Sequence, residues 1–118
     1  MKITIEAKTA KLSIVRLDGA LNKQTEEKTK KAFKDLADQG VKRVILDLAQ
    51  TSFIDSSGLT ILVYGLRQFG SEPGNFLLVA PQSQPRLLFE LTMMADRVFL
   101  ICDTMDEALA KMDGGERD

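Results

Sequence analysis

Short apolar runs alternate with segments of helical periodicity along this chain, and this alternation restricts the folds that it can adopt. Residues 44–48 (VILDL) and 76–79 (FLLV) are nearly continuous apolar runs, typical of strands covered on both faces. Between them, Gly70 ends a pattern of helical spacing made by Leu59, Leu62, Val63, Leu66 and Phe69. A strand, a helix and a second strand in this order predict a right-handed crossover within a mostly parallel sheet.

The N-terminal third predicts two strands and a helix before the first of these runs. Alternating polar and apolar residues indicate strands at residues 3–7 and 12–17, and the Asp-Gly pair at 18–19 is expected to close the second. Because the turn between them is short enough for a hairpin, the first strand is expected to pair antiparallel at the sheet edge. Asn22 is the expected N-cap of the first helix, and Gly40 its expected stop.

The C-terminal third predicts two more helices and one more strand. Pro81 ends the strand before it, and Ser83 can cap the next helix. The buried face of that helix is expected to carry Leu87, Leu88, Leu91 and Met94. Residues 98–102 (VFLIC) indicate the last strand, and Thr104 begins a capping-box pattern that opens the last helix.

These elements assemble into one α/β domain with the predicted order β-β-α-β-α-β-α-β-α and a mostly parallel sheet that carries an antiparallel edge strand. A chain of 118 residues suffices for one domain with a sizeable core. The domain is expected to occupy residues 1–112, and residues 113–118 are expected to form a flexible tail.

Composition and charge exclude several classes of function. A formal net charge of -1 gives no basic field for nucleic acid or an anionic membrane. No apolar run approaches the ~20 residues that span a bilayer, and the N-terminus lacks a signal-peptide core, so a cytoplasmic protein without membrane insertion is expected. The absence of histidine excludes Ser-His-Asp and Cys-His nucleophiles and histidine-based zinc sites. Cys102, in an apolar segment, is expected to be a buried, inert thiol.

The sequence Asp55-Ser56-Ser57-Gly58 is the candidate functional site. It follows the strand at residues 44–48 and opens a helix, and function in parallel α/β sheets collects at the carboxyl ends of strands. A helix N-terminus offers unpaired N–H groups and about half a positive charge, which would hold a phosphate attached there. Gly58 would let another molecule approach the backbone closely. The alternative is that Asp55 and the serines only cap the helix.

The wider stretch at residues 53–59 (FIDSSGL) resembles the hallmark F-[ILM]-D-S-[ST]-G-L of the STAS domain, in particular that of the bacterial anti-sigma factor antagonists. Three more segments resemble the same family: the strand at 44–48, the turn at 19–22 (GALN) and the strand at 76–79. The resemblance covers nearly the whole chain. Two positions differ from the family pattern, since Asn22 stands where many members have Asp and Thr60 where the antagonists often have Gly.

The resemblance implies a phosphorylation switch. The unmodified antagonist binds an anti-sigma factor that is also an ATP-dependent serine kinase, which frees a sigma factor; phosphorylation of the antagonist dissociates the complex, and a phosphatase resets it. By motif position the modified residue is Ser56, with Ser57 as the alternative, and Asp55 contacts the partner or positions the hydroxyl. The residues expected to contact the partner are Asn22, Asp55, Ser56, Ser57, Gly58, Leu59 and Thr60.

The switch assigns no catalytic residue, cofactor or metal to this chain, because ATP and its metal are expected on the partner kinase.

Other classes of function fit the sequence less well. An enzyme with Ser56 as nucleophile is disfavoured, since neither an S-x-x-K arrangement nor G-x-S-x-G occurs. A receiver domain would need an acidic pair where Asp18 stands alone, and Asp47 is expected to bond to backbone. A nucleotide-binding domain would need a glycine-rich phosphate motif that the sequence lacks. A STAS domain acting as an unphosphorylated scaffold or small-ligand sensor stays open.

Overall fold

The structure, a computed structural model, describes residues 1–70, 74–95 and 98–115. Its strands are β1 (Lys2–Ala7), β2 (Leu12–Leu21), β3 (Arg43–Asp47), β4 (Thr51–Ile54), β5 (Phe76–Val79) and β6 (Leu100–Cys102). Its helices are α1 (Glu26–Asp38), α2 (Ser56–Phe69), α3 (Ser83–Leu91) and α4 (Met105–Gly115). None of the helices within the described ranges has the length and apolar character needed to cross a membrane.

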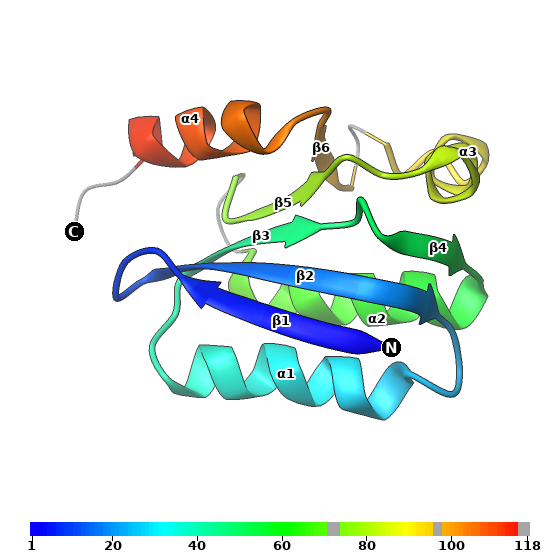
Figure 1. The fold of residues 1–118 in the computed structure, drawn as a ribbon, viewed down its shortest axis with the longest axis horizontal. Coiled ribbons are helices and arrows are strands. Elements are labelled where there is room, and N and C mark those ends of the chain that lie inside the picture. Colours follow the sequence, from blue (N-terminus) through cyan, green and yellow to red (C-terminus); the bar gives the residue numbers. More distant parts are fainter. Residues whose placement is uncertain (71–73, 96–97, 116–118) are drawn as a thin grey trace.

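The sheet has the strand order β1-β2-β3-β5-β6, and β4 pairs separately with the end of β2. Among the strands of the described residues, only the β1–β2 pair is antiparallel, as expected for a hairpin at the edge; the other neighbouring strands are parallel. Helices α1 and α2 cover one face of the sheet, and α4 covers the other, while α3 lies beside β4 (Figure 1). The predicted single α/β domain with a mostly parallel sheet is therefore confirmed.

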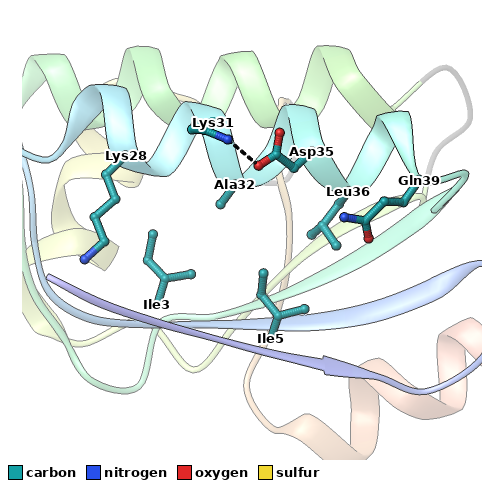
Figure 2. Close-up of a pocket in the computed structure, with 8 residues that line it drawn as sticks. All are labelled: Ile3, Ile5, Lys28, Lys31, Ala32, Asp35, Leu36 and Gln39. Carbon is teal, nitrogen blue, oxygen red and sulfur yellow. Dashed lines mark hydrogen bonds and ion pairs between the residues drawn. The ribbon is translucent and has the colours of Figure 1, made fainter.

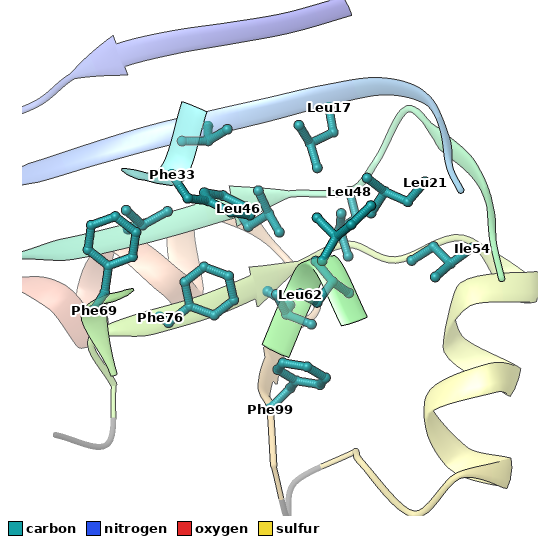
Figure 3. Close-up of a cluster of buried hydrophobic side chains, with 14 of the residues drawn as sticks. Leu17, Leu21, Phe33, Leu46, Leu48, Ile54, Leu62, Phe69, Phe76 and Phe99 are labelled. Carbon is teal, nitrogen blue, oxygen red and sulfur yellow. The ribbon is translucent and has the colours of Figure 1, made fainter. Parts of the chain in front are cut away.

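The main core lies between the sheet and the pair α1–α2 (Figure 3). Phe33 of α1 meets Phe76 of β5 edge to face, with ring centroids 5.7 Å apart. A Cβ on Gly65 of α2 would lie 2.8 Å from the Phe76 ring, so a glycine there lets the two helices and the sheet approach. Leu62 is fully buried in this core, as predicted, and a buried leucine of this kind contributes about 1.5–3 kcal/mol.

The buried face of α2 is narrower than the predicted apolar pattern. Its buried residues are Gly58, Ile61, Leu62, Gly65 and Phe69. Leu59, Val63 and Leu66 are only partly buried and pack against the margins of the core. The helix ends at Phe69, with Gly70 as its C-cap, as the sequence predicts.

The sheet contains one short strand that the sequence pattern did not indicate. Thr51–Ile54 forms β4 and pairs in parallel with residues 19–21 at the end of β2. The expectation that the Asp-Gly pair at 18–19 closes the second strand is wrong, because β2 continues to Leu21 and bends through Gly19, whose φ is +130°. The observed order is β-β-α-β-β-α-β-α-β-α.

The start of α1 also differs from the prediction. Asn22 is not its N-cap, because the helix begins at Glu26 with Thr25 in the capping position. The Asn22 side-chain oxygen instead accepts hydrogen bonds from the backbone N–H groups of Gln24 (3.0 Å) and Thr25 (3.2 Å), which folds a tight turn between β2 and the helix. Gly40, with φ of +92°, lies just after the end of the helix, as predicted.

The predicted apolar face of α3 is wrong at two of its four positions. The helix buries Pro85 and Phe89, while Leu87 is 53% and Leu91 72% exposed. Leu88 and Met94 are partly buried and pack on the core. Ser83 is the first helical residue and not the cap, since Gln82 occupies the capping position.

The C-terminal elements follow the predictions more closely. Cys102 is buried at the end of β6, and the Thr104 hydroxyl accepts a hydrogen bond from the Glu107 N–H at 3.1 Å, as a capping residue does. Of the last predicted strand, Leu100–Cys102 forms β6, and Phe99 before it makes an isolated parallel bridge with Ala95. The helix α4 runs to Gly115, so residues 113–115, which were expected in the tail, are helical, and residues 116–118 lie outside the described residues.

Candidate functional site

The Asp-Ser-Ser-Gly motif lies where β2 and β4 end side by side. Leu21 of β2 is in parallel register with Ile54 of β4, and the Asp55 N–H donates to the Leu21 carbonyl at 3.2 Å. Because parallel strands end at the same edge, the next residues along each strand, Asn22 and Asp55, lie next to each other. The fold thus brings together two candidate partner contacts that are 33 positions apart in the sequence.

Asp55 caps the helix that carries the serines. Its backbone is extended, and its side-chain oxygen accepts a hydrogen bond from the Gly58 N–H at 2.9 Å. Its carbonyl accepts the first helical hydrogen bond, from the Leu59 N–H at 3.0 Å. The carboxylate is also favourable at the positive end of the helix dipole. The capping role considered for Asp55 is therefore confirmed, and it fixes how the next two residues are presented.

The two serines occupy the first turn of α2 but differ in exposure. Ser56 is exposed as the first residue of the helix, whereas Ser57 is half-buried. Thr60, one turn later, is exposed and donates its hydroxyl to the Ser56 carbonyl at 3.2 Å. A phosphate on Ser56 would lie at the positive end of the α2 dipole, beside the Asp55 carboxylate that already accepts from the Gly58 N–H. The structure thus presents Ser56 to solvent at the predicted position.

Gly58 is required by packing inside the chain. A Cβ at this position would lie 2.5 Å from the Leu21 carbonyl oxygen and 2.7 Å from the Ile54 side chain. Both distances are far below a normal contact, and the first involves backbone that cannot move aside cheaply. The expectation that this glycine leaves room for another molecule is therefore wrong: the space is filled by β2 and β4. Leu59, beside it, is partly buried against the core.

Gln84 is a site-positioning residue that the sequence pattern did not indicate. Its side-chain oxygen accepts from the Ile54 N–H and its side-chain nitrogen donates to the Ile54 carbonyl, both at 2.9 Å. Nearby, the Gln82 side chain donates to the Ala49 carbonyl at 2.7 Å. An amide in the first turn of a helix has no distinctive sequence pattern, so only the fold reveals that α3 holds the end of β4.

Asp47, at the end of β3, has a structural role. Its side-chain oxygen accepts from the Ala49 N–H at 2.9 Å, as predicted for a carboxylate that bonds to backbone. Its other oxygen lies 3.6 Å from the Arg16 guanidinium. These contacts order the turn between β3 and β4, which leads to the motif.

Comparisons with known proteins identify the family. A family model described as the STAS domain matches residues 4–108. A Thermotoga neapolitana protein, named as a candidate anti-sigma factor antagonist, is 32% identical over 82 residues, which are 70% of this chain and 72% of that protein. An anti-sigma factor antagonist from Mycobacterium paratuberculosis has a crystal structure that is 26% identical, with a TM-score of 0.81 and 92% and 91% of the two chains covered.

The fold is also that of SpoIIAA, an anti-sigma factor antagonist solved in two states. The unphosphorylated form is 23% identical with a TM-score of 0.80, covering 96% of this chain and 97% of that one. The phosphorylated form, from Bacillus, is 22% identical with a TM-score of 0.72, covering 94% and 99%. Sequence and fold agree, and the chain belongs to the STAS domain family.

Proposed function

We propose that this protein is an anti-sigma factor antagonist that is switched by phosphorylation of Ser56. In its unmodified form it binds an anti-sigma factor with serine kinase activity, and a sigma factor is freed. Phosphorylation by that kinase releases the antagonist, and a phosphatase restores it. The chain acts in the cytoplasm as a binding protein and contributes no catalytic group, because the nucleotide and its metal are carried by the kinase.

The observation that carries this proposal is the exposure of Ser56 at the capped start of α2. The Asp55 cap holds the helix N-terminus in a defined position, so the Ser56 hydroxyl is presented on a rigid element and not on a mobile loop. The neighbouring Asn22 turn and Thr60 lie around the same point and complete a polar docking surface. Relatives that carry the name anti-sigma factor antagonist support the choice of partner.

A phosphate on Ser56 would change binding far more than folding. It adds about -1.5 to -2 charges. Within the chain this charge lies at the favourable end of α2, although close to the Asp55 carboxylate. In the complex the same charge must lose its water or approach the nucleotide phosphates on the kinase, and both effects oppose binding. This asymmetry is what a release switch requires.

The test is to incubate the protein with ATP and the anti-sigma factor that copurifies with it, and to measure its intact mass. We expect the mass of one phosphate, localised to Ser56 by fragmentation. Ser56→Ala should abolish the increase, whereas the matched variant Ser57→Ala should retain it. If the mass increase disappears in Ser57→Ala and persists in Ser56→Ala, Ser57 is the phosphorylated residue. No increase in the wild-type protein would contradict the switch and favour an unphosphorylated STAS scaffold or ligand sensor.

A further inference from the structure

The outer edge of β1 is available to pair with another strand. β1 ends the strand order, and within the described ranges only β2 pairs with it. The Lys8 N–H donates to the Leu12 carbonyl, so the even-numbered residues of β1 direct their backbone groups toward β2. The backbone N–H and C=O groups of Ile3 and Ile5 therefore point away from the sheet. An unpaired edge of this kind is a template for a further strand.

An apolar groove follows this edge. It has a volume of about 380 Å³ and lies between β1 and α1, where Ile3 and Ile5 point toward Ala32 and Leu36 (Figure 2). Ile5 is 46% exposed, which is high for a large apolar side chain in a strand. The helical rim of the groove is charged and polar, and consists of Lys28, Lys31, Asp35 and Gln39.

We propose that this edge binds a second copy of the chain, through antiparallel pairing of β1 with β1 about a two-fold axis at Thr4. The strand sequence KITIE is self-complementary in that arrangement. Lys2 would face Glu6 of the second copy, and Ile3 would face Ile5 of the second copy. Each pair occurs twice, as a two-fold interface requires. The two sheets would join into one.

Charge selects this register among those that the backbone allows. Ile3 and Ile5 direct both their N–H and C=O groups outward, so they must form the hydrogen-bonded pairs with the second copy. The register can therefore shift only in steps that keep these two residues in hydrogen-bonded pairs. A shift in either direction separates Lys2 from Glu6 of the second copy. In the proposed register Lys2 would lie between its own neighbour Asp18 and that Glu6, in a row of alternating charge. Glu6 also contacts its own Arg16 at 2.9 Å.

The same pairing would fill the groove. Ile3 and Ile5 of both copies would lie on the face covered by α1, and the two α1 helices would run antiparallel. This orientation places the Lys28 end of one helix beside the Asp35 end of the other, where each Asp35 already forms an ion pair with its own Lys31 at 2.8 Å (Figure 2). The site at Ser56 follows β3 and β4, on the opposite side of β2 from β1, and stays exposed in both copies (Figure 1).

A charge-swap experiment tests the pairing directly. Lys2→Glu places two carboxylates opposite each other in a homodimer, and Glu6→Lys places two ammonium groups opposite each other. Sedimentation of each variant from about 1 μM to about 1 mM should show a dimer dissociation constant raised by roughly tenfold or more. An equimolar mixture of the two variants pairs opposite charges at both positions, and should recover the dimer. Thermal melts of each variant check that both are folded.

Three results would overturn the proposal. They are a monomeric wild-type protein over the whole concentration range, single variants that dimerise as well as the wild type, and a mixture that stays monomeric although both variants are folded. The second of these would mean that the copies associate through another surface.

A cross-linking experiment tests the register. In the proposed dimer the two Thr4 residues form a non-hydrogen-bonded pair, with Cα atoms about 4.5 Å apart, which suits a disulfide. Thr4→Cys should therefore form a covalent dimer under mild oxidation. The matched variant Glu6→Cys should not, because the two copies of position 6 would lie about 13 Å apart. The natural Cys102 is buried and does not compete. Equal cross-linking of the two variants would contradict the register.

Discussion

The side-chain amide of Gln84 makes two hydrogen bonds with the backbone of Ile54, accepting from its N–H and donating to its carbonyl, both at 2.9 Å. This is the pattern that a neighbouring strand would provide, so the first turn of α3 completes the open edge of β4. Ile54 directly precedes the Asp55 cap. The start of α2, where Ser56 is presented, is therefore held from one side by β2 and from the other by α3.

Gln84→Ala should lower the free energy of unfolding by about 1–3 kcal/mol, because it leaves two partly buried backbone groups of Ile54 without partners. Urea denaturation gives the value. Gln82→Ala is the matched control: it removes a single exposed hydrogen bond, to the Ala49 carbonyl, and should cost less than about 1 kcal/mol. Equal losses in the two variants would contradict the special role of Gln84.

Gly58→Ala should destabilise the protein by about 1–3 kcal/mol, although alanine is normally the better helix former. The new Cβ would lie 2.5 Å from the Leu21 carbonyl oxygen, and one of the two elements must shift. Thr60→Ala, on the exposed side of the same helix, should change the unfolding free energy by no more than about 0.5 kcal/mol. A stabilising Gly58→Ala would show that α2 does not contact β2 as closely as described.

Leu62 and Leu91 are both predicted from the sequence to lie on the buried face of a helix, but their truncation to alanine should change stability by very different amounts. Leu62→Ala removes a fully buried side chain of α2 and should cost about 2–5 kcal/mol. Leu91→Ala removes a side chain of α3 that is 72% exposed and should cost less than about 0.5 kcal/mol. Denaturant melts of both variants give the two unfolding free energies. A loss in Leu91→Ala as large as that in Leu62→Ala would mean that Leu91 is buried, as the sequence pattern predicted for α3.

That contrast reflects what periodicity can and cannot reveal. The helix α2 could be predicted because its apolar residues form a stripe, and β3 and β5 because they are continuous apolar runs. The segment at residues 87–91 (LLFEL) is apolar on too many sides to single out one face. Which side is buried depends on how α3 docks, and the buried Pro85 and Phe89 lie on a face that the leucine pattern did not select.

The features of the candidate site also separate into those that are local in sequence and those that depend on strand pairing. A cap followed by a helical pattern is local, so the exposed Ser56 and the capping Asp55 could be predicted from the sequence. The strand β4 could not, because four residues that lead directly into the motif become a strand only by pairing with residues 19–21 of β2. The close packing of Gly58 and the hydrogen bonds of Gln84 depend on that pairing, so the sequence pattern alone does not reveal them.

The buried thiol of Cys102 should make stability fall at high pH. Burial raises the pKa of Cys102, and the neighbouring Glu107 carboxylate adds to the effect. The unfolded thiol, with a pKa of about 8.5, then loses its proton at a lower pH than the folded one, so unfolding is favoured as pH rises above about 8.5. The unfolding free energy of Cys102→Ala should fall less steeply between about pH 8 and pH 10. If the unfolding free energy of the wild type and of Cys102→Ala falls equally steeply with pH, groups other than Cys102 cause the loss of stability.

A negative charge at Ser56 should control partner binding without unfolding the protein. The most direct measurement is calorimetric titration of the wild-type protein, Ser56→Asp and Ser56→Ala into the copurified anti-sigma factor, with thermal melts alongside. Ser56→Asp should lose at least about tenfold in affinity, or about 1.4 kcal/mol, while its unfolding free energy stays within about 1 kcal/mol of the wild type. Ser56→Ala should bind as the wild type does. If both Ser56→Asp and Ser57→Asp bind as tightly as the unmodified protein, the switch is contradicted.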